Sequence, residues 1–131
     1  MSQENERFVG ELIETWNRGD LAVDEVFAPD IEFEVSHGTD VDGTYHGQED
    51  TVRAVMRFWG AFTDYRSEIE ETRANGDCVF IAAHHYARGK QSGVAVDMTN
   101  WQAFTLRGGR VVRYGIYGRR EQALEAAGLS E

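Results

Sequence analysis

Only one cysteine, Cys78, occurs among the 131 residues of the chain. A single cysteine excludes an intramolecular disulfide and a cysteine-rich zinc site. We therefore expect a reducing, cytoplasmic compartment. The segment from Met1 to Asp20 mixes charged residues throughout and has no apolar stretch of the kind that a signal peptide needs, which agrees with this expectation.

Long apolar runs and prolines are also scarce. No run approaches the roughly 18 apolar residues that span a bilayer, so no membrane partner is expected. Pro29 is the only proline, and neither a Pro/Gly/Ser-rich linker nor an internal repeat interrupts the chain. Residues 1–131 are therefore expected to form a single domain.

Positive charge is the third shortage. The chain has 13 Lys and Arg against 23 Asp and Glu, which gives a formal net charge of −10. Because such a surface repels phosphodiester backbones, nucleic acid is not an expected partner. Apolar residues make up 41% of the chain, enough for the core of a globular domain.

Common metal and cofactor motifs are missing too. No glycine-rich phosphate loop opens a helix, and no nucleophile elbow is present. The segment Asp40–Gly43 resembles the start of a calcium loop, but Tyr45 stands where the loop needs glycine and Thr51 where it needs glutamate. No two histidines have helical zinc spacing, so we expect neither a metal nor a cofactor.

What the sequence does contain is a succession of periodic segments. Helical spacing predicts a first helix ending near Gly19, a short helix ending before Pro29, a third helix opened by residues 47–50 and a last helix over 119–127. The apolar stripes of the first and third helices are Phe8, Val9, Leu12, Ile13 and Trp16, and Val52, Val55, Met56, Trp59 and Phe62.

Alternating patterns predict five strands, separated by turns at Asn75-Gly76 and Gly108-Gly109 and by an expected loop over 37–47. The strands are Ile31–Val35, Tyr65–Arg73, Cys78–Tyr86, Val94–Leu106 and Val111–Tyr117. The strand over 65–73 is highly charged and is expected at a sheet edge. The strand over 78–86 is apolar on both faces and is expected to be covered on both. This order predicts an α+β fold with a curved antiparallel sheet, not a βαβ fold.

Several segments, in this order, resemble the nuclear transport factor 2-like superfamily, in its SnoaL-like and ketosteroid isomerase-like branch. They are Trp16–Asp20, Phe27–Phe33, Tyr45–Glu49 and Phe104–Val112, with Arg88–Val94 and Glu121–Leu129 resembling a bacterial subgroup. The resemblance covers nearly the whole chain. It implies a cone-shaped (cystatin-like) fold in which the curved sheet wraps around helices and leaves a deep pocket, and members often dimerise through the outer sheet face.

The resemblance does not carry a known set of catalytic residues with it. Ketosteroid isomerases use an aspartate base with a tyrosine and a protonated aspartate, and these positions fall at about Val35, Leu12 and Gln102. The acidic residue on the last strand of SnoaL-type cyclases falls at about Ile116. No Asp or Glu occurs anywhere in 111–118.

Two amides on one face of the long strand give the best indication of a pocket. Asn100 and Gln102 belong to the alternating set of 94–106 that is otherwise apolar. They are expected either to orient a ligand or to satisfy each other, a backbone group or a buried water. Trp16, Val35, Trp59, Tyr114 and Ile116 complete the expected pocket lining.

His84 and His85 are adjacent on a strand, so they point to opposite faces of the sheet. Only one of them is expected to face the pocket, where it could act as a base or serve a structural role. The sequence does not choose between them, because both faces of this strand are apolar. Trp101 belongs to the outward set of its strand and is expected in a homodimer interface.

Three hypotheses for function follow. The first is a protein that binds a small, mostly apolar molecule in the cone. The second is an isomerase, cyclase or hydratase that uses His84 or His85 as general base. The third is a non-catalytic structural or interaction module whose cone is filled by side chains. The size of the cavity, and whether a histidine lies in it, distinguish the three.

Overall fold

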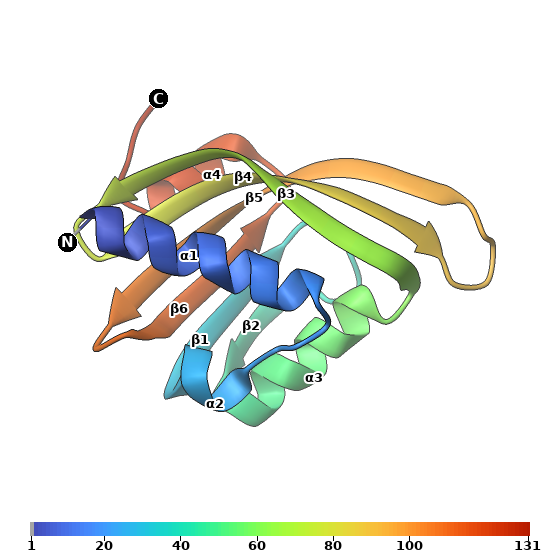
Figure 1. Cartoon of the computed structure of the whole chain (residues 1–131), viewed down its shortest axis with the longest axis horizontal. Coiled ribbons are helices and arrows are strands. Elements are labelled where there is room, and N and C mark those ends of the chain that lie inside the picture. Colours follow the sequence, from blue (N-terminus) through green and yellow to red (C-terminus); the bar gives the residue numbers. More distant parts are fainter. Residues whose placement is uncertain (1) are drawn as a thin grey trace.

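The computed structural model describes residues 2–131, which form one six-stranded sheet with four helices (Figure 1). The helices are α1 (Ser2–Asn17), α2 (Val23–Val26), α3 (Gln48–Trp59) and α4 (Arg120–Ala126). The strands are β1 (Phe27–Ser36), β2 (Gly43–His46), β3 (Phe62–Asn75), β4 (Cys78–Gly89), β5 (Ala95–Arg107) and β6 (Arg110–Tyr117).

The strands lie in the order β2-β1-β6-β5-β4-β3. Strands β3 to β6 form an antiparallel meander, and β1 joins the free edge of β6 in the same direction as β6. The α+β class and the curved sheet are confirmed, but the sheet is mixed where a wholly antiparallel one was expected. The charged strand β3 lies at an edge, as its composition predicted.

Three local expectations were wrong. Residues 43–46, expected as loop, form β2 and pair with β1. The short second helix, expected to end just before Pro29, stops at Val26, and Phe27 already begins β1. Phe62 begins β3, because α3 ends at Trp59, so Phe62 does not continue the apolar stripe of that helix.

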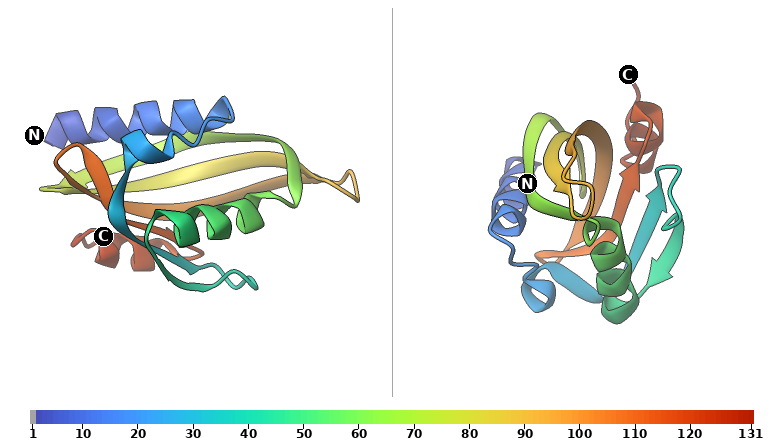
Figure 2. Two further views of the ribbon diagram at one scale, coloured as in Figure 1. Left: turned by 90° about the horizontal axis from the view of Figure 1, so that it is seen from below. Right: turned by 90° about the vertical axis from the view of Figure 1, so that its right-hand side faces the viewer.

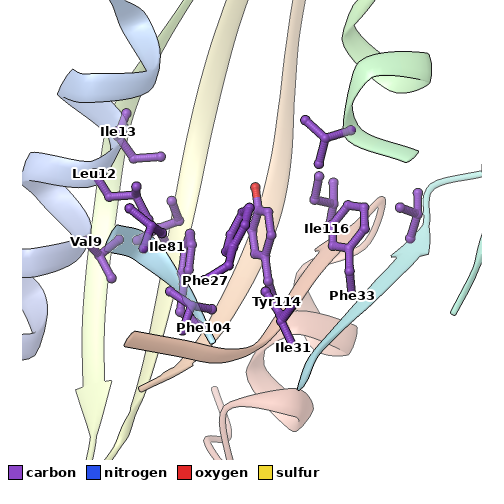
Figure 3. Packing of buried hydrophobic residues seen from close by; sticks show 14 of the residues in the cluster. Val9, Leu12, Ile13, Phe27, Ile31, Phe33, Ile81, Phe104, Tyr114 and Ile116 are labelled. Carbon is purple, nitrogen blue, oxygen red and sulfur yellow. The ribbon is translucent and has the colours of Figure 1, made fainter. Parts of the chain in front are cut away.

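The main core lies on the inner, concave face of the sheet, under α1 and α3. Figure 3 shows Val9, Leu12 and Ile13 of α1 approaching inward residues of the sheet such as Ile81 and Phe104. All of these residues are buried. The apolar stripe predicted for α1 is therefore the surface that covers the sheet.

A second, smaller core lies on the outer face of the sheet, beneath α4 (Figure 2). Phe80, Ala103 and Tyr117 from the strands pack there against Ala123 and Leu124 of the helix. The outer face of β4 is thus covered at Phe80, as its sequence predicted, but His84 and Tyr86 further along this face are only half-buried. The covering at Phe80 comes from the chain's own last helix.

Candidate functional site

A cavity of about 190 Å³ opens on the inner side of the sheet, between α1 and α3. Its walls are mostly apolar and aromatic, and its polar groups come from the strands β3 to β6. No residue with a permanent charge lines it. The lining residues are Ile13, Trp16, Gly19, Leu21, Met56, Trp59, Tyr65, Ser67, His85, Gln102 and Tyr114.

His85 is the titratable centre of this cavity. It shares the inward set of β4 with Val79, Ile81 and Ala83, and its side chain is 1% exposed. Its Nδ1 lies 2.5 Å from the Tyr65 hydroxyl and 2.7 Å from Ser67 Oγ. Its Nε2 lies 2.7 Å from Asn100 Oδ1, so both ring nitrogens are engaged.

A directed chain of hydrogen bonds runs behind His85. The Tyr114 hydroxyl donates to Gln102 Oε1 at 2.9 Å, and Gln102 Nε2 donates to Asn100 Oδ1 at 3.0 Å. An amide oxygen can only accept, so His85 Nε2 must donate its proton to Asn100. In the neutral imidazole Nδ1 then carries the free lone pair. The amides therefore fix the tautomer that presents a basic nitrogen to Tyr65 and Ser67.

The side-chain nitrogen of Asn100, Nδ2, is buried without a hydrogen-bond partner. A buried N–H without an acceptor is uncommon and costs free energy. The oxygen of the same amide, in contrast, accepts from both His85 and Gln102. The orientation of the Asn100 side chain thus gives its oxygen two hydrogen bonds and leaves its nitrogen with none.

Burial sets the protonation of the site. Desolvation lowers the pKa of His85 below its usual value, and the hydrogen bond to Asn100 only partly opposes this effect; positive charge on His37 or His84 would lower it further. His85 is therefore neutral near pH 7. Burial raises the pKa of Tyr65 and of Tyr114, so both hydroxyls keep their protons.

Two local features position the β3 residues. Asp64, in the left-handed region with φ of 55°, lies in an irregularity of the β3–β4 register immediately before Tyr65. Such bulges redirect side chains. Further along, Asn17 at the end of α1 accepts from the Ser67 N–H and donates to the Ser67 carbonyl, both at 2.8 Å. The end of α1 thereby holds the strand segment that carries Ser67.

The predicted site residues divide into three groups. Trp16, Trp59, Gln102 and Tyr114 line the cavity, and Figure 3 shows the Tyr114 hydroxyl pointing from β6 into the space between the helices. Asn100 does not line the cavity but bonds to two residues that do. Val35 and Ile116, the positions of family carboxylates, do not line it either; both are buried in the main core.

The two histidines lie on opposite faces of the sheet, as expected for adjacent residues of one strand. His85 faces the cavity, whereas His84 lies on the outer face. There its Nε2 contacts the Asp97 carboxylate, and its Nδ1 lies 3.2 Å from Thr99 Oγ1. The lining of the cavity includes neither His84 nor its partners. Trp101 also lies on the outer face, half-buried against the second core.

Sequence reasoning missed the contribution of β3. Tyr65 and Ser67 were passed over because their strand is so highly charged. A signal was present, since Tyr65, Ser67 and Ile69 alternate with Arg66, Glu68 and Glu70. That alternation distinguishes an inward set from an outward charged one.

Nothing in the described structure forms a metal centre. Among residues 2–131, no group of three or more His, Cys, Asp or Glu side chains is placed to hold a metal ion. Asp42, in the segment that resembles a calcium loop, instead accepts from the backbone N–H groups of His37, Gly38 and Thr39. Its burial alone would raise its pKa, but these donors outweigh burial and lower the pKa. Among the helices of residues 2–131, none is long and apolar enough to cross a membrane.

Comparisons with known proteins agree with this architecture. No match was found among curated protein sequences. A proposed SnoaL-like polyketide cyclase from Jannaschia sp. CCS1 is 20% identical, with 88% of this chain and 85% of that chain covered and a TM-score of 0.77. An NTF2-like protein of unknown function from Burkholderia pseudomallei K96243 is 18% identical, with 94% and 96% covered and a TM-score of 0.78.

A third similar structure contains a bound ligand. It is a hypothetical protein with a ketosteroid isomerase-like fold from Catenulispora acidiphila DSM 44928, in complex with trimethylamine. It is 19% identical, with 94% of this chain and 93% of that chain covered and a TM-score of 0.69. At such identities these structures establish the fold. The model of the SnoaL-like domain matches residues 9–114, and the chain therefore belongs to the SnoaL-like domain family.

Proposed function

We propose that this protein binds a small, uncharged, mostly apolar molecule in the cavity and that His85 acts on it as a general base. The observation that carries the proposal is a neutral, buried histidine in an otherwise apolar cavity, with its tautomer fixed by Asn100. A base whose pKa lies near or below neutral pH is ready to accept a proton there.

The chemistry that suits this arrangement is proton removal next to a carbonyl group. The proton would move from the ligand's carbon to Nδ1 of His85. The electron pair of the broken C–H bond would form a C=C bond, and the π electrons of the carbonyl would move onto its oxygen to give an enolate. The Tyr65 hydroxyl, which stays protonated and lines the same cavity, would donate to that oxygen. Isomerisations and cyclisations of ketones share this first step.

The family is consistent with such chemistry. One of the similar structures is a proposed polyketide cyclase, and carbonyl-adjacent proton removal is a step that cyclisation of a polyketide needs. The walls of Trp16, Trp59 and Tyr65 fit a flat ring better than a long chain. A cavity of about 190 Å³ restricts the ligand to a small one.

Deuterium exchange tests this proposal. The protein is incubated in D₂O with 1-indanone, a small neutral aryl ketone, and deuterium at the carbon beside the carbonyl is followed by mass spectrometry. His85→Gln is expected to lower the catalysed rate by about 10²–10⁴-fold. His84→Gln is the matched control, because His84 lies on the outer face. Equal rates in the wild type and the His85 variant would refute the role of His85.

Binding without turnover is the second candidate. It is supported by the hydrogen bonds that link Tyr114, Gln102, Asn100 and His85 to one another. Polar groups that already bond to one another can serve to hold the pocket in shape. Under this alternative the wild type and the His85→Gln variant would bind 1-indanone with equal affinity, measured by quenching of Trp16 and Trp59 fluorescence. Neither protein would catalyse deuterium exchange. The open cavity argues against the third hypothesis, a cone filled by its own side chains.

A homodimer through the outer sheet face completes the proposal. This face carries half-buried Trp101, which packs against the core beneath α4, and half-buried His84, with Asp97 and Thr99 beside His84. Trp101→Glu is expected to shift the protein to a smaller species in sedimentation velocity. A wild-type protein that sediments as a monomer at high micromolar concentration would exclude the dimer.

A further inference from the structure

We propose that Ser67 is a nucleophile activated by His85 and that the cavity hydrolyses small neutral esters. The inference rests on the proposed role of His85 as a base, but not on proton removal from carbon. It starts from three side chains that come from three different strands. Ser67 Oγ lies 2.7 Å from His85 Nδ1, and His85 Nε2 lies 2.7 Å from Asn100 Oδ1.

These contacts form the three-part arrangement of nucleophilic hydrolases: a nucleophile, a base and a group that orients the base. Here the nucleophile contacts Nδ1 and the orienting group contacts Nε2. The chain from Tyr114 through Gln102 makes Asn100 Oδ1 the acceptor, so Nδ1 is free to take the Ser67 proton. Ser67 itself is held through its backbone by Asn17.

Tyr65 supplies the fourth component. Its hydroxyl and Ser67 Oγ both lie within hydrogen-bond distance of Nδ1, which has a single in-plane lone pair. When Ser67 donates to that lone pair, the Tyr65 proton is released for another acceptor. Both residues line the cavity, so the Tyr65 hydroxyl can donate to the oxygen of a carbonyl that Ser67 attacks.

The steps balance with water as the second substrate. Ser67 Oγ forms a bond to the ester carbon while its proton moves to His85 Nδ1, and the carbonyl electrons move onto the oxygen beside Tyr65. The intermediate collapses, and the alcohol leaves with the proton from His85. Water then attacks the acyl group on Ser67 and gives a proton to His85. His85 returns that proton to Ser67 as the acid departs.

The cavity also indicates which esters fit. It has no residue of permanent positive charge to hold an anion, and the chain as a whole carries a net charge of −10. Anionic esters are therefore disfavoured. The aromatic walls suit a small acyl or alcohol group that contains a ring, which defines the substrate class as short, neutral aryl esters.

The outer face offers an internal comparison. Thr99 Oγ1 lies 3.2 Å from His84 Nδ1, and the Asp97 carboxylate contacts His84 Nε2. This set also has a hydroxyl, a histidine and an orienting group. It lies outside the cavity that Ser67 shares with His85, however, and Asp97 is largely exposed. Both sets have a similar hydrogen-bond pattern, so we infer that access to the cavity is what makes Ser67 the nucleophile.

The test is covalent labelling with phenylmethylsulfonyl fluoride, a small neutral aromatic reagent that modifies activated serines. Intact and peptide mass spectrometry locate the label. The expected result is one adduct, on Ser67, with labelling absent in Ser67→Ala and slowed by about 10²–10⁴-fold in His85→Gln. Thr99→Ala, the matched control from the outer face, should label like the wild type. Circular dichroism and thermal melting check that each variant is folded.

Hydrolysis of p-nitrophenyl acetate gives the second readout. A burst of p-nitrophenol equal to the enzyme concentration, lost in Ser67→Ala, would support the acyl-serine step. A label on Tyr65, or labelling of Ser67 that is equally fast in His85→Gln, would overturn the proposal. If 1-indanone exchange depends on His85 while Ser67 stays unlabelled, the nucleophile is refuted and the proposed function stands. His85-dependent labelling without exchange would support Ser67 and refute proton removal from carbon.

Discussion

The side chain of Asn17 pairs with the backbone of Ser67 in the way that a neighbouring strand would. Its Oδ1 accepts the Ser67 N–H and its Nδ2 donates to the Ser67 carbonyl, each at 2.8 Å. Ser67 lies on β3, the edge strand of the sheet, where these backbone groups have no strand partner on the outside. A helix end therefore completes the sheet edge at the residue that contacts His85.

Asn17→Ala should destabilise the protein by about 1–3 kcal/mol, because it leaves a half-buried N–H and carbonyl without partners. Asn17→Asp should be intermediate, since a carboxylate still accepts from the N–H but cannot donate to the carbonyl. Urea unfolding measures both. Asn5→Ala is the control: Asn5 makes one exposed bond to the Gly76 carbonyl, and its loss should change stability by less than about 0.5 kcal/mol.

The protonation of His85 makes stability depend on pH. Burial lowers its pKa in the folded state below 6.5, the usual value that applies in the unfolded chain. Between these two pKa values the unfolded state binds more protons than the folded state, so stability rises with pH. The contribution is fully present above 6.5 and is lost as pH falls from there through the folded-state pKa.

The measurement is the free energy of unfolding at pH 7.5 and 5.5 for the wild type and His85→Gln. The wild type should lose more stability on acidification than the variant, which has no titrating group at this position. NMR of ¹⁵N-labelled histidine should find Nε2 of His85 protonated and Nδ1 unprotonated at pH 7.5. A protonated Nδ1 at that pH would contradict the direction of the hydrogen-bond chain.

The sequence predicted the set of residues that faces inward on β4 and β5, but not how β3 lies against them. An unbroken register from the pairs Asn75–Cys78 and Thr72–Ile81 would place Ser67 opposite Tyr86, on the outer face. An irregularity between Ile69 and Glu71 moves the register by one residue, and Ser67 then pairs with His85. A one-residue shift exchanges the two faces of a strand, so counting the register from the turn at Asn75-Gly76 puts Ser67 on the wrong face. Only the local alternation of residues 65–70 indicates the correct face.

A second bulge affects β6 in the same way. Leu106 pairs with Val111 and Thr105 with Arg113, so Val112 is the extra residue. Simple alternation from Tyr114 would turn Val112 inward, whereas the structure buries Val111 completely. Tyr114 and Ile116 lie beyond the bulge and keep their predicted inward orientation. Periodicity was therefore reliable within each regular stretch and failed only across its interruptions.

Gly115 should resist substitution, although its backbone does not require glycine. A Cβ there would lie 2.3 Å from the Tyr117 hydroxyl oxygen and 2.5 Å from its ring. Tyr117 is buried and donates to Glu34 at 2.7 Å, so the ring cannot move without losing that bond. We expect Gly115→Ala to cost about 1–3 kcal/mol in thermal or urea unfolding.

Gly10 is the matched control for this prediction. It lies within α1, and a Cβ added there would meet nothing within 4 Å. Gly10→Ala should therefore stabilise the protein by up to about 1 kcal/mol through helix propensity. If both substitutions changed stability in the same direction, the packing of Tyr117 against Gly115 would not be the determining contact.

Met56 offers a way to alter the cavity without disturbing the fold. Its side chain lines the cavity from α3 and is 57% exposed, so a charged replacement stays solvated. Met56→Glu should weaken binding of 1-naphthol, a neutral aromatic probe, by about tenfold, or about 1.4 kcal/mol, because apolar contact at the cavity mouth is lost. Its effect on unfolding should stay below about 1 kcal/mol, the usual cost of an acidic residue near a helix C-terminus.

Quenching of tryptophan fluorescence measures this binding, since Trp16 and Trp59 line the cavity and Trp101 does not. Val94→Glu is the control, because Val94 is similarly exposed, at 62%, but lies outside the cavity. It should leave the affinity for 1-naphthol unchanged. Equal losses in the two variants would place the probe on the general surface and not between α1 and α3, and the ligand site would have to be sought elsewhere.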